Sequence, residues 1–265
     1  MGNPKSFLSF RFTIKKYIMP INETGHYKNI TSLDKMILKA QGFGATYNPS
    51  KVSIKIASLQ TLSTQAKADY SPVSPASVSY NNAVNDRIII FQPYKTFSTQ
   101  ILAAFKTSSD ANPQKIKDLV TINRKIQGSR TPKKDAVPVD PNAPAPETIS
   151  ASQQSYEMKY DHFVEFIDVI LSEATYLPNE TELKLPALQT FKASLLAANT
   201  AVSTLFETVN QARIKRDKTL YNEKTGVYTI QGLVKEYVKG VYKVNSIQYK
   251  QMVAIKFTKP AKLFI

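Results

Sequence analysis

The chain has 265 residues, a formal net charge of +15 and no cysteine. This length allows one large domain or two modest ones, and the lack of cysteine excludes disulfides, thiolate metal sites and a cysteine nucleophile. No apolar run reaches the roughly 18–20 residues of a membrane span, and Arg11 interrupts the apolar patch at 7–10 before it is long enough for a signal peptide. We therefore expect a cytoplasmic protein.

Residues 1–18 are predicted to be an N-terminal extension outside the fold. The chain from Met19 opens with polar residues and continues into the first helical pattern, so either Met1 or Met19 fits as the start of translation. The alternative is a short strand, because Phe10, Phe12 and Ile14 alternate along the chain.

Two segments of the chain repeat each other. Residues 45–61 (ATYNPSKVSIKIASLQT) align without a gap with residues 174–190 (ATYLPNETELKLPALQT), and eight of the seventeen positions are identical. A match this dense predicts a duplicated structural unit. The proline-rich segment 128–150 lies between the copies and is unsuited to a helix interior or a central strand. We therefore predict a first domain at 19–127, a linker at 128–150 and a second domain at 151–265.

The apolar spacing in each half predicts helices. The first helix of each half is marked by Ile30, Leu33, Ile37 and Ala40, and by Phe163, Phe166, Ile167, Ile170, Leu171 and Ala174. Asn29 or Thr31 is the expected N-cap in the first half, and Ser152 in the second. A third helix and a short fourth follow later in each half, marked by Tyr94, Phe97, Ile101, Phe105, Ile116, Leu119, Val120 and Ile126, and by Ile230, Leu233, Tyr237, Val241, Tyr249, Met252 and Val253.

The second helix of the second half carries a heptad pattern. Its apolar positions are Leu188, Phe191, Leu195, Ala198, Val202, Leu205, Val209 and Ala212. We interpret them as a seam inside an antiparallel bundle; an intermolecular coiled coil is the alternative. Pro72 and Pro75 should kink or split the equivalent helix of the first half. The predicted fold is all-α: two tandem homologous antiparallel bundles, each with three long helices and a short one.

Several segments resemble a set of uncharacterised bacterial proteins that are somewhat shorter than this chain. The segments are ETGHYKN at 23–29, the ATYNP turn, NRKIQG at 123–128, the proline-rich linker, ARIKRDKTLYN at 212–222 and SIQYKQMVAIKF at 246–257. The likeness runs from Met19 to Phe257 and departs from the family at residues 1–18, Pro72 and Pro75. It implies duplicated helical bundles. It carries no known activity, so no functional residue is transferred.

Motifs for catalysis are missing from the sequence. A zinc site would need both histidines, His26 and His162, together with carboxylates, and isolated histidines are far more often surface or capping residues. The sequence has no GxSxG elbow and no glycine-rich phosphate loop. We therefore expect no enzyme activity, no metal and no cofactor.

The positive charge is the one functional signal in the sequence. Two basic clusters are candidate polyanion-binding sites: Arg124, Lys125, Arg130, Lys133 and Lys134 around the start of the linker, and Arg213, Lys215, Arg216 and Lys218 on the long helix. Residues 151–212 hold eight acidic and three basic side chains, whereas 213–265 hold twelve basic and three acidic ones. We expect these two segments to pair within the second bundle and to neutralise much of the field.

The sequence thus favours a non-enzymatic structural or partner-binding protein, which contacts an unknown protein or itself. The alternative is a sequence-nonspecific nucleic-acid-binding protein that uses the basic clusters to contact phosphates. A role on a membrane is not expected, because no predicted helix combines a basic face with exposed bulky apolar residues.

Overall fold

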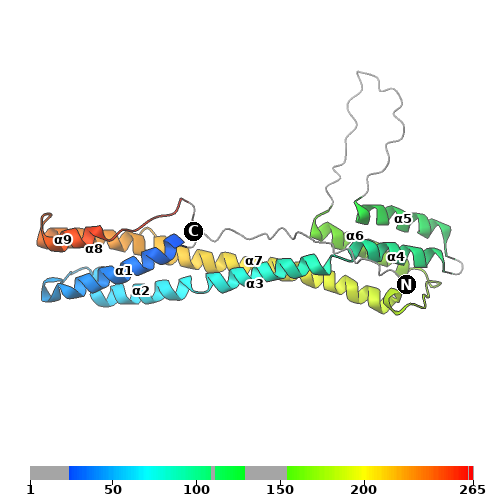
Figure 1. Cartoon of the computed structure of the whole chain (residues 1–265), viewed down its shortest axis with the longest axis horizontal. Coiled ribbons are helices and arrows are strands. Elements are labelled where there is room, and N and C mark those ends of the chain that lie inside the picture. Colours follow the sequence, from blue (N-terminus) through cyan, green and yellow to red (C-terminus); the bar gives the residue numbers. More distant parts are fainter. Residues whose placement is uncertain (1–23, 109–110, 129–153, 262, 265) are drawn as a thin grey trace, which may run out of the picture. The chain divides into compact units, whose positions relative to one another are not determined.

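The computed structural model describes residues 24–108, 111–128, 154–261, 263 and 264. Helices make up 78% of these residues, and none of the described residues lies in a strand (Figure 1). The prediction of an all-α protein is confirmed. Residues 1–18 and the linker after Gly128 fall outside the described part.

The helices follow the predicted order, with one division in the first half. They are α1 (Thr24–Gly42), α2 (Ile56–Tyr70), α3 (Val73–Ile90), α4 (Tyr94–Lys106), α5 (Pro113–Gln127), α6 (Tyr156–Leu171), α7 (Leu185–Tyr221), α8 (Val227–Tyr242) and α9 (Ile247–Ala254). Pro72 lies between α2 and α3, so the expected split occurs where proline cannot continue a helix. Pro75 falls in the first turn of α3, where a missing N–H removes no intrahelical hydrogen bond.

Two expected helix caps lie elsewhere. Helix α6 begins after Ser155, whose Oγ accepts a hydrogen bond from the Met158 amide at 3.2 Å, rather than after Ser152. Helix α1 begins at Thr24, so Asn29 and Thr31 lie inside it. Asn29 is buried there. Because its side chain does not cap the helix, it bonds instead to Tyr221 and to the main chain of Thr258.

The compact units of the fold differ from the predicted halves. Unit 1 joins residues 1–81 to residues 209–265, and unit 2 consists of residues 82–208. Each unit therefore combines helices from both halves of the chain, and the boundaries fall inside α3 and α7. The predicted division into domains at 19–127 and 151–265 is not the division of this structure. Both halves of the chain carry helices with one apolar face, so helices from different halves can share a core.

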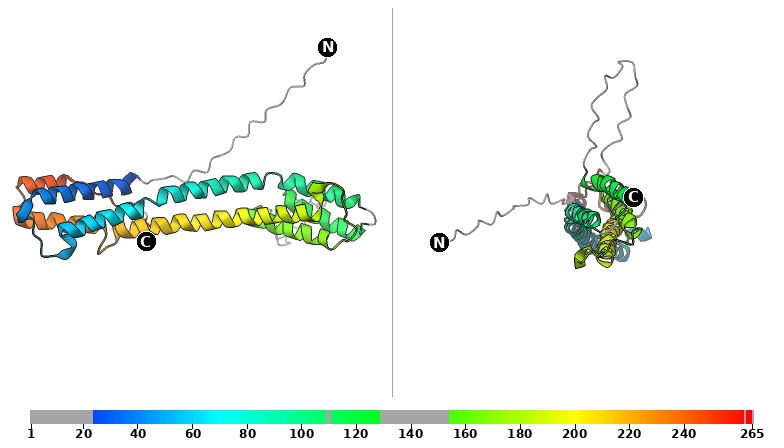
Figure 2. Two further views of the ribbon diagram at one scale, coloured as in Figure 1. Left: turned by 90° about the horizontal axis from the view of Figure 1, so that it is seen from below. Right: turned by 90° about the vertical axis from the view of Figure 1, so that its right-hand side faces the viewer.

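In unit 1, α1 and α2 from the first half pack with α8 and α9 from the second half (Figures 1 and 2). The core includes Ile30, Leu33, Met36, Leu59, Leu220, Val227, Ile230, Val234, Val238 and Met252, all with at most 3% of their surface exposed. Val241 continues the apolar pattern of α8 but is 46% exposed, whereas Tyr242 beside it packs against the core.

In unit 2, α4 and α5 from the first half pack with α6 and the first part of α7 from the second half. Its core is rich in aromatic rings: the Phe163 ring lies 5.2 Å from Phe191, edge to face, and Phe97 lies 5.0 Å from Phe191. Leu188, Leu195 and Ala198 of the predicted heptad seam are buried in this core. The first part of the seam therefore packs inside unit 2, whereas Val209 and Ala212 belong to unit 1.

The repeated segments have the same local geometry in both units. The hydroxyl of Tyr47 donates to the carbonyl of Ile54 at 2.7 Å, and that of Tyr176 donates to the carbonyl of Leu183 at 2.8 Å. A short 3-10 turn, at Val52–Ile54 and at Thr181–Leu183, then leads into α2 or α7. Burial raises the pKa of both tyrosines to about 12, with a smaller contribution from the ionised neighbour, Tyr237 for the first and Glu180 for the second.

Each tyrosine contacts a helix from the other half of the chain. The Tyr47 ring lies 5.2 Å from the Tyr237 ring of α8, and the Tyr176 ring lies 5.9 Å from the Phe105 ring of α4. In unit 1 the tyrosine of the first half thus packs on a helix of the second half, and in unit 2 the tyrosine of the second half packs on a helix of the first half. We refer to residues 43–55 and 172–184 as the tyrosine turns.

Candidate functional site

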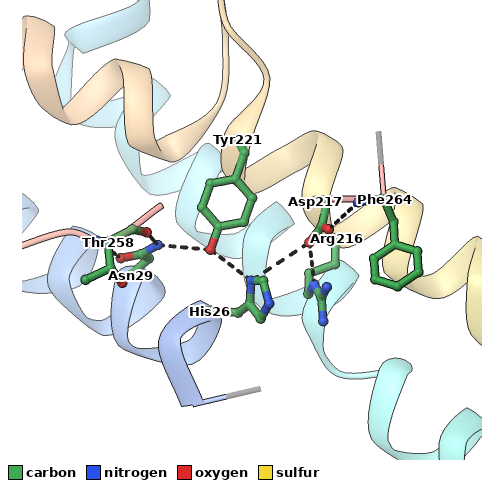
Figure 3. Close-up of polar contacts among 7 residues, drawn as sticks. All are labelled: His26, Asn29, Arg216, Asp217, Tyr221, Thr258 and Phe264. Carbon is green, nitrogen blue, oxygen red and sulfur yellow. Dashed lines mark hydrogen bonds and ion pairs between the residues drawn. The ribbon is translucent and has the colours of Figure 1, made fainter. Parts of the chain in front are cut away.

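Unit 1 contains a buried polar cluster where α1 lies beside the end of α7 (Figure 3). The cluster consists of His26 and Asn29 from α1 with Arg216, Asp217 and Tyr221 from α7, and none of these residues is more than 7% exposed. Spacings of three residues (His26 to Asn29) and four residues (Asp217 to Tyr221) place these side chains on one face of each helix, and Arg216 is buried next to Asp217. Buried polar groups carry a large energetic cost unless they are hydrogen-bonded, so their partners define what the cluster does.

The hydroxyl of Tyr221 is shared by both α1 residues. It lies 2.8 Å from Nδ1 of His26 and accepts a hydrogen bond from Nδ2 of Asn29 at 3.1 Å. The tautomer of His26 sets which of the two groups donates, and either arrangement gives one hydrogen bond between them. The cluster thus ties α1 to α7 across nearly 200 residues of sequence.

The carboxylate of Asp217 is the fully buried charge of the cluster. Its Oδ1 accepts a hydrogen bond from Nε of Arg216 at 2.7 Å and lies 3.8 Å from Nδ1 of His26. Its Oδ2 accepts a hydrogen bond from the Phe264 amide at 2.9 Å. A buried carboxylate with an arginine and a main-chain donor has the partners that a buried charge requires.

The cluster and its neighbours in unit 1 hold the C-terminal segment (residues 255–261, 263 and 264), mainly through its main chain. Asn29 donates to the Thr258 carbonyl at 2.7 Å and accepts from the Thr258 amide at 2.9 Å. Ser32 donates to the carbonyl of Lys256 at 2.9 Å, and Lys235 to that of Ile255 at 2.9 Å. Burial lowers the pKa of Lys235, with a smaller effect from Lys256. Ile255 and Phe257 pack against the core of unit 1, so the segment closes this part of the unit.

A second buried carboxylate, Asp69 of α2, lies beside the same region of α7. Its Oδ2 accepts hydrogen bonds from Gln65 at 2.9 Å and Thr219 at 2.7 Å, and its Oδ1 pairs with Nζ of Lys215 at 3.1 Å. Burial alone would raise the pKa of Asp69, but these three partners outweigh it and hold the pKa below the usual value. The carboxylate therefore stays charged and ties α2 to α7.

His26, Asp217 and Tyr221 are residue types that act as acids and bases in enzymes, but here they are buried between helices. A general base must reach the proton that it abstracts from a substrate, whereas His26, Asp217 and Tyr221 are covered by α1, α7 and the C-terminal segment. Each polar atom described above already bonds to another part of unit 1. The arrangement orients helices and holds the C-terminal segment.

The predicted basic cluster on α7 is divided by the helix. Arg213 and Arg216 face inward, with 7% and 2% of their surface exposed, and the guanidinium of Arg213 lies 5.3 Å from the Phe264 ring. Lys215 and Lys218 face outward. Spacing along the sequence could not reveal this division, because arginine is seldom expected in a core.

The other predicted basic cluster is only partly described. Arg124 and Lys125 are exposed near the end of α5 in unit 2, and Lys125 pairs with Glu165 at 3.2 Å. Arg130, Lys133 and Lys134 lie outside the described residues. The described members of the two predicted clusters lie in different units: Arg124 and Lys125 in unit 2, and the four α7 residues in unit 1.

The expected pairing of residues 151–212 with residues 213–265 is wrong for the ion pairs that the structure shows. Glu157, Glu165 and Glu173 pair with bases from the first half: Arg87, Lys125 and Lys115. In unit 1, Lys215 pairs with Asp69 and Arg216 with Asp217. The exchange of helices explains the difference, because it places the acidic segment in unit 2 and the basic segment in unit 1.

As a result, the net charge is concentrated in one unit. The described residues of unit 1 include seventeen Lys and Arg against five Asp and Glu, whereas those of unit 2 include ten of each kind. Four of the five acids of unit 1 already pair with bases of the same unit: Asp34 with Lys67, Asp69 with Lys215, Asp217 with Arg216, and Glu236 with Lys239. The sequence conceals this asymmetry, because each half of the chain is moderately basic.

His26 and His162 lie in different units, and both are buried. Within the described ranges, no group of three or more His, Asp or Glu side chains is placed to hold a metal ion. Among the same residues, no helix is both long and apolar enough to cross a membrane.

Comparison with protein-family models, with curated proteins and with solved structures finds no match to this chain. The resemblance of its short segments to uncharacterised bacterial proteins therefore remains an expectation from sequence.

Proposed function

We propose that this chain is a non-enzymatic, partner-binding helical protein and that unit 1 contacts an anionic partner. The observation that carries the proposal is the charge of unit 1, whose described residues include seventeen basic side chains and only five acidic ones. Most of the acids are already paired, and every described lysine of unit 1 except Lys235 is exposed. A field of one sign attracts partners of the opposite charge and speeds their association.

The buried polar cluster supports a binding protein over an enzyme. Its histidine, carboxylate and tyrosine are engaged in holding α1, α7 and the C-terminal segment together. A unit whose helices and C-terminal segment are joined by buried hydrogen bonds suits recognition of a partner by shape and charge.

The alternative function is sequence-nonspecific binding of nucleic acid. The same surplus of lysines would neutralise phosphates and release counterions. The geometry gives less support to this alternative than the sequence suggested, because Arg213 and Arg216 of the predicted cluster are buried.

We also propose that the two halves of the chain arose by duplication. The offset of 129 residues between the tyrosine turns relates the hydrogen bonds of Tyr47 and Tyr176, the two 3-10 turns, and the first residues of α2 and α7. This agreement in hydrogen bonding supports common descent more strongly than identity of sequence over seventeen positions.

A pull-down from the native host at low and at high salt tests the proposed function. We expect a partner that is retained at low salt, released at high salt, and still retained after nuclease treatment. Loss of the partner only after nuclease treatment would favour the nucleic-acid alternative. Retention that does not depend on salt would contradict an electrostatic contact.

A further inference from the structure

One end of unit 1 combines lysines with exposed apolar side chains. The connection from α1 to α2 and the connection from α8 to α9 both lie at this end (Figures 1 and 2). The two connections touch: the Phe43 ring lies 5.1 Å from the Tyr242 ring, and the Asn48 amide donates to the Tyr237 hydroxyl at 2.9 Å. We call residues 38–55 and 239–250 the basic tip.

The basic tip contains lysines and no acidic residue. The lysines are Lys39, Lys51, Lys55, Lys239, Lys243 and Lys250, and all six are exposed. Only Lys239 pairs with a carboxylate in the described structure, that of Glu236 at 3.6 Å. The charge at this end of unit 1 is therefore almost entirely uncompensated.

Bulky apolar residues are exposed among these lysines. Leu38 and Val52 are each 67% exposed, Val244 is 53% exposed, and Ile247 is 70% exposed. Val241, whose position in α8 continues the buried pattern, is 46% exposed. Single apolar residues on a surface are ordinary, whereas several at one end of a unit mark an interaction site.

The connection from α8 to α9 is also strained. Lys243 has a φ of 66° and a ψ of 161°, and it is the only non-glycine residue with positive φ in the described chain. This region of backbone space is nearly restricted to glycine, and such strain is typical of functional segments. Glycine would adopt this conformation more easily, yet the chain has a lysine there, between the exposed Val241 and Val244.

The matching end of unit 2 shows that the fold does not require this charge. Residues 38–55 contain three lysines and no acid, whereas the equivalent residues 167–184 contain four acids and one lysine. Glu180 stands where unit 1 has Lys51, in a turn with the same tyrosine hydrogen bond. The basic character of the tip is therefore specific to unit 1.

We propose that the basic tip docks onto an anionic lipid surface. The inference rests on the proposed function and names the partner class of unit 1. Lysines near a membrane surface are attracted to anionic headgroups, while exposed aliphatic side chains enter the boundary between headgroups and acyl chains. A nucleic-acid backbone would use the lysines and leave Val52, Val244 and Ile247 without a role. The sequence concealed this surface, because its residues come from two connections that are distant in the chain.

Flotation of the full-length chain with phosphatidylcholine vesicles, with and without phosphatidylserine, tests the proposal. We expect binding only to vesicles that contain phosphatidylserine. Each lysine near the surface contributes about fivefold to partitioning, so K51E/K243E should weaken binding by about 25-fold or more. The matched control is K218E/K224E, which makes the same change in charge at the opposite end of α8 and should weaken binding less than about threefold, because charges beyond a Debye length are screened.

A second variant separates lipid from other anionic partners. V52S/I247S keeps the net charge, and we expect it to lose about tenfold or more in vesicle binding, because two side chains no longer enter the bilayer. Its affinity for duplex DNA should equal that of the original chain. Circular dichroism of each variant verifies that the helices are intact.

Four outcomes would overturn the lipid proposal. Equal loss of vesicle binding in K51E/K243E and K218E/K224E would mean that the charge of the whole unit, and not the tip, attracts the surface. Unchanged vesicle binding in V52S/I247S would exclude insertion. Binding to duplex DNA without binding to vesicles would reject the lipid surface and leave the anionic-partner function standing, whereas failure to bind any anionic partner would contradict both.

Discussion

Unit 1 and unit 2 share the tyrosine turn, which joins α1 to α2 in unit 1 and α6 to α7 in unit 2, but they differ in charge and in core. The turn of unit 2 is acidic and that of unit 1 is basic, although Tyr47 and Tyr176 make equivalent hydrogen bonds. Unit 1 buries Asp217 with Arg216, whereas unit 2 has an aromatic core around Phe163. The geometry of the turn therefore depends on the tyrosine and the main chain, and it tolerates opposite surface charges in the two units.

The largest difference between the units should come from the buried ion pair. Asp217→Asn removes the charge that compensates Arg216, and removing one partner of a buried pair costs about 3–5 kcal/mol. We expect the free energy of unfolding of unit 1 to fall by this amount, as measured by hydrogen exchange of its amides at increasing urea concentrations. The control is Glu165→Gln in unit 2, which breaks an exposed pair with Lys125 and should cost less than about 1 kcal/mol. An equal loss in both variants would refute the contrast.

A smaller effect is expected where unit 1 holds the C-terminal segment. Asn29→Ala leaves both the amide and the carbonyl of Thr258 without their partner. Unsatisfied polar groups cost about 1–3 kcal/mol when buried, and we expect about 2 kcal/mol here because the site is partly buried. The amide of Thr258 should exchange faster with solvent, whereas exchange in α6 of unit 2 should stay the same. Unchanged exchange at Thr258 would show that Asn29 does not hold the segment.

The tyrosine turns should respond alike in the two units. Tyr47→Phe and Tyr176→Phe each remove one hydrogen bond to a main-chain carbonyl, and each should cost about 1 kcal/mol. A difference of more than about 1 kcal/mol between the two variants would count against equivalence of the turns.

The same tyrosines predict a dependence of stability on alkaline pH. Their pKa values in the folded chain, about 12, lie above the ordinary value of 10.0. The stability that they contribute is therefore complete below pH 10 and declines as the pH rises toward 12. Tyrosinate absorbance during alkaline titration measures this, and both substitutions together should reduce the loss of stability in that range.

The smallest effect concerns the strained lysine of the basic tip. Lys243→Gly relieves the backbone at a positive φ, which should stabilise unit 1 by about 1 kcal/mol. The same substitution removes a lysine from the tip and should weaken vesicle binding by about fivefold. A gain in stability with a loss in binding would indicate that the strain is retained for function. A loss of stability would show that Lys243 serves packing instead.

The helices of this fold were predictable because the signal for them is local. The spacing of Phe163, Phe166 and Ile170 determines which face of α6 is buried, whichever helix covers that face. Pro72 likewise ends α2 through its own ring. The tyrosine turns could be matched between the halves because the repeat preserves Tyr47 and Tyr176.

The pairing of helices was not predictable from this sequence. The two halves carry equivalent apolar faces, so periodicity gives no reason for α8 to pack with α1 and α2 rather than with α6 and α7. The burial of Arg216, a residue of the predicted polyanion site, was not predictable for a related reason. In the sequence, Arg216 lies among other cations and has the pattern of a surface residue. It is buried with Asp217 because α1 and the C-terminal segment pack beside it.

The interleaved arrangement affects how the protein is made. Helices α1 and α2 leave the ribosome before the 127 residues of unit 2, and their partners α8 and α9 follow only after them. At about 5–20 residues per second, this delay lasts roughly 6–25 s. During that time, Leu33, Met36 and Leu59 belong to a half-built core. Unit 2 can therefore fold first although unit 1 begins first, and a nascent chain that pauses before residue 227 would be a natural client for chaperones.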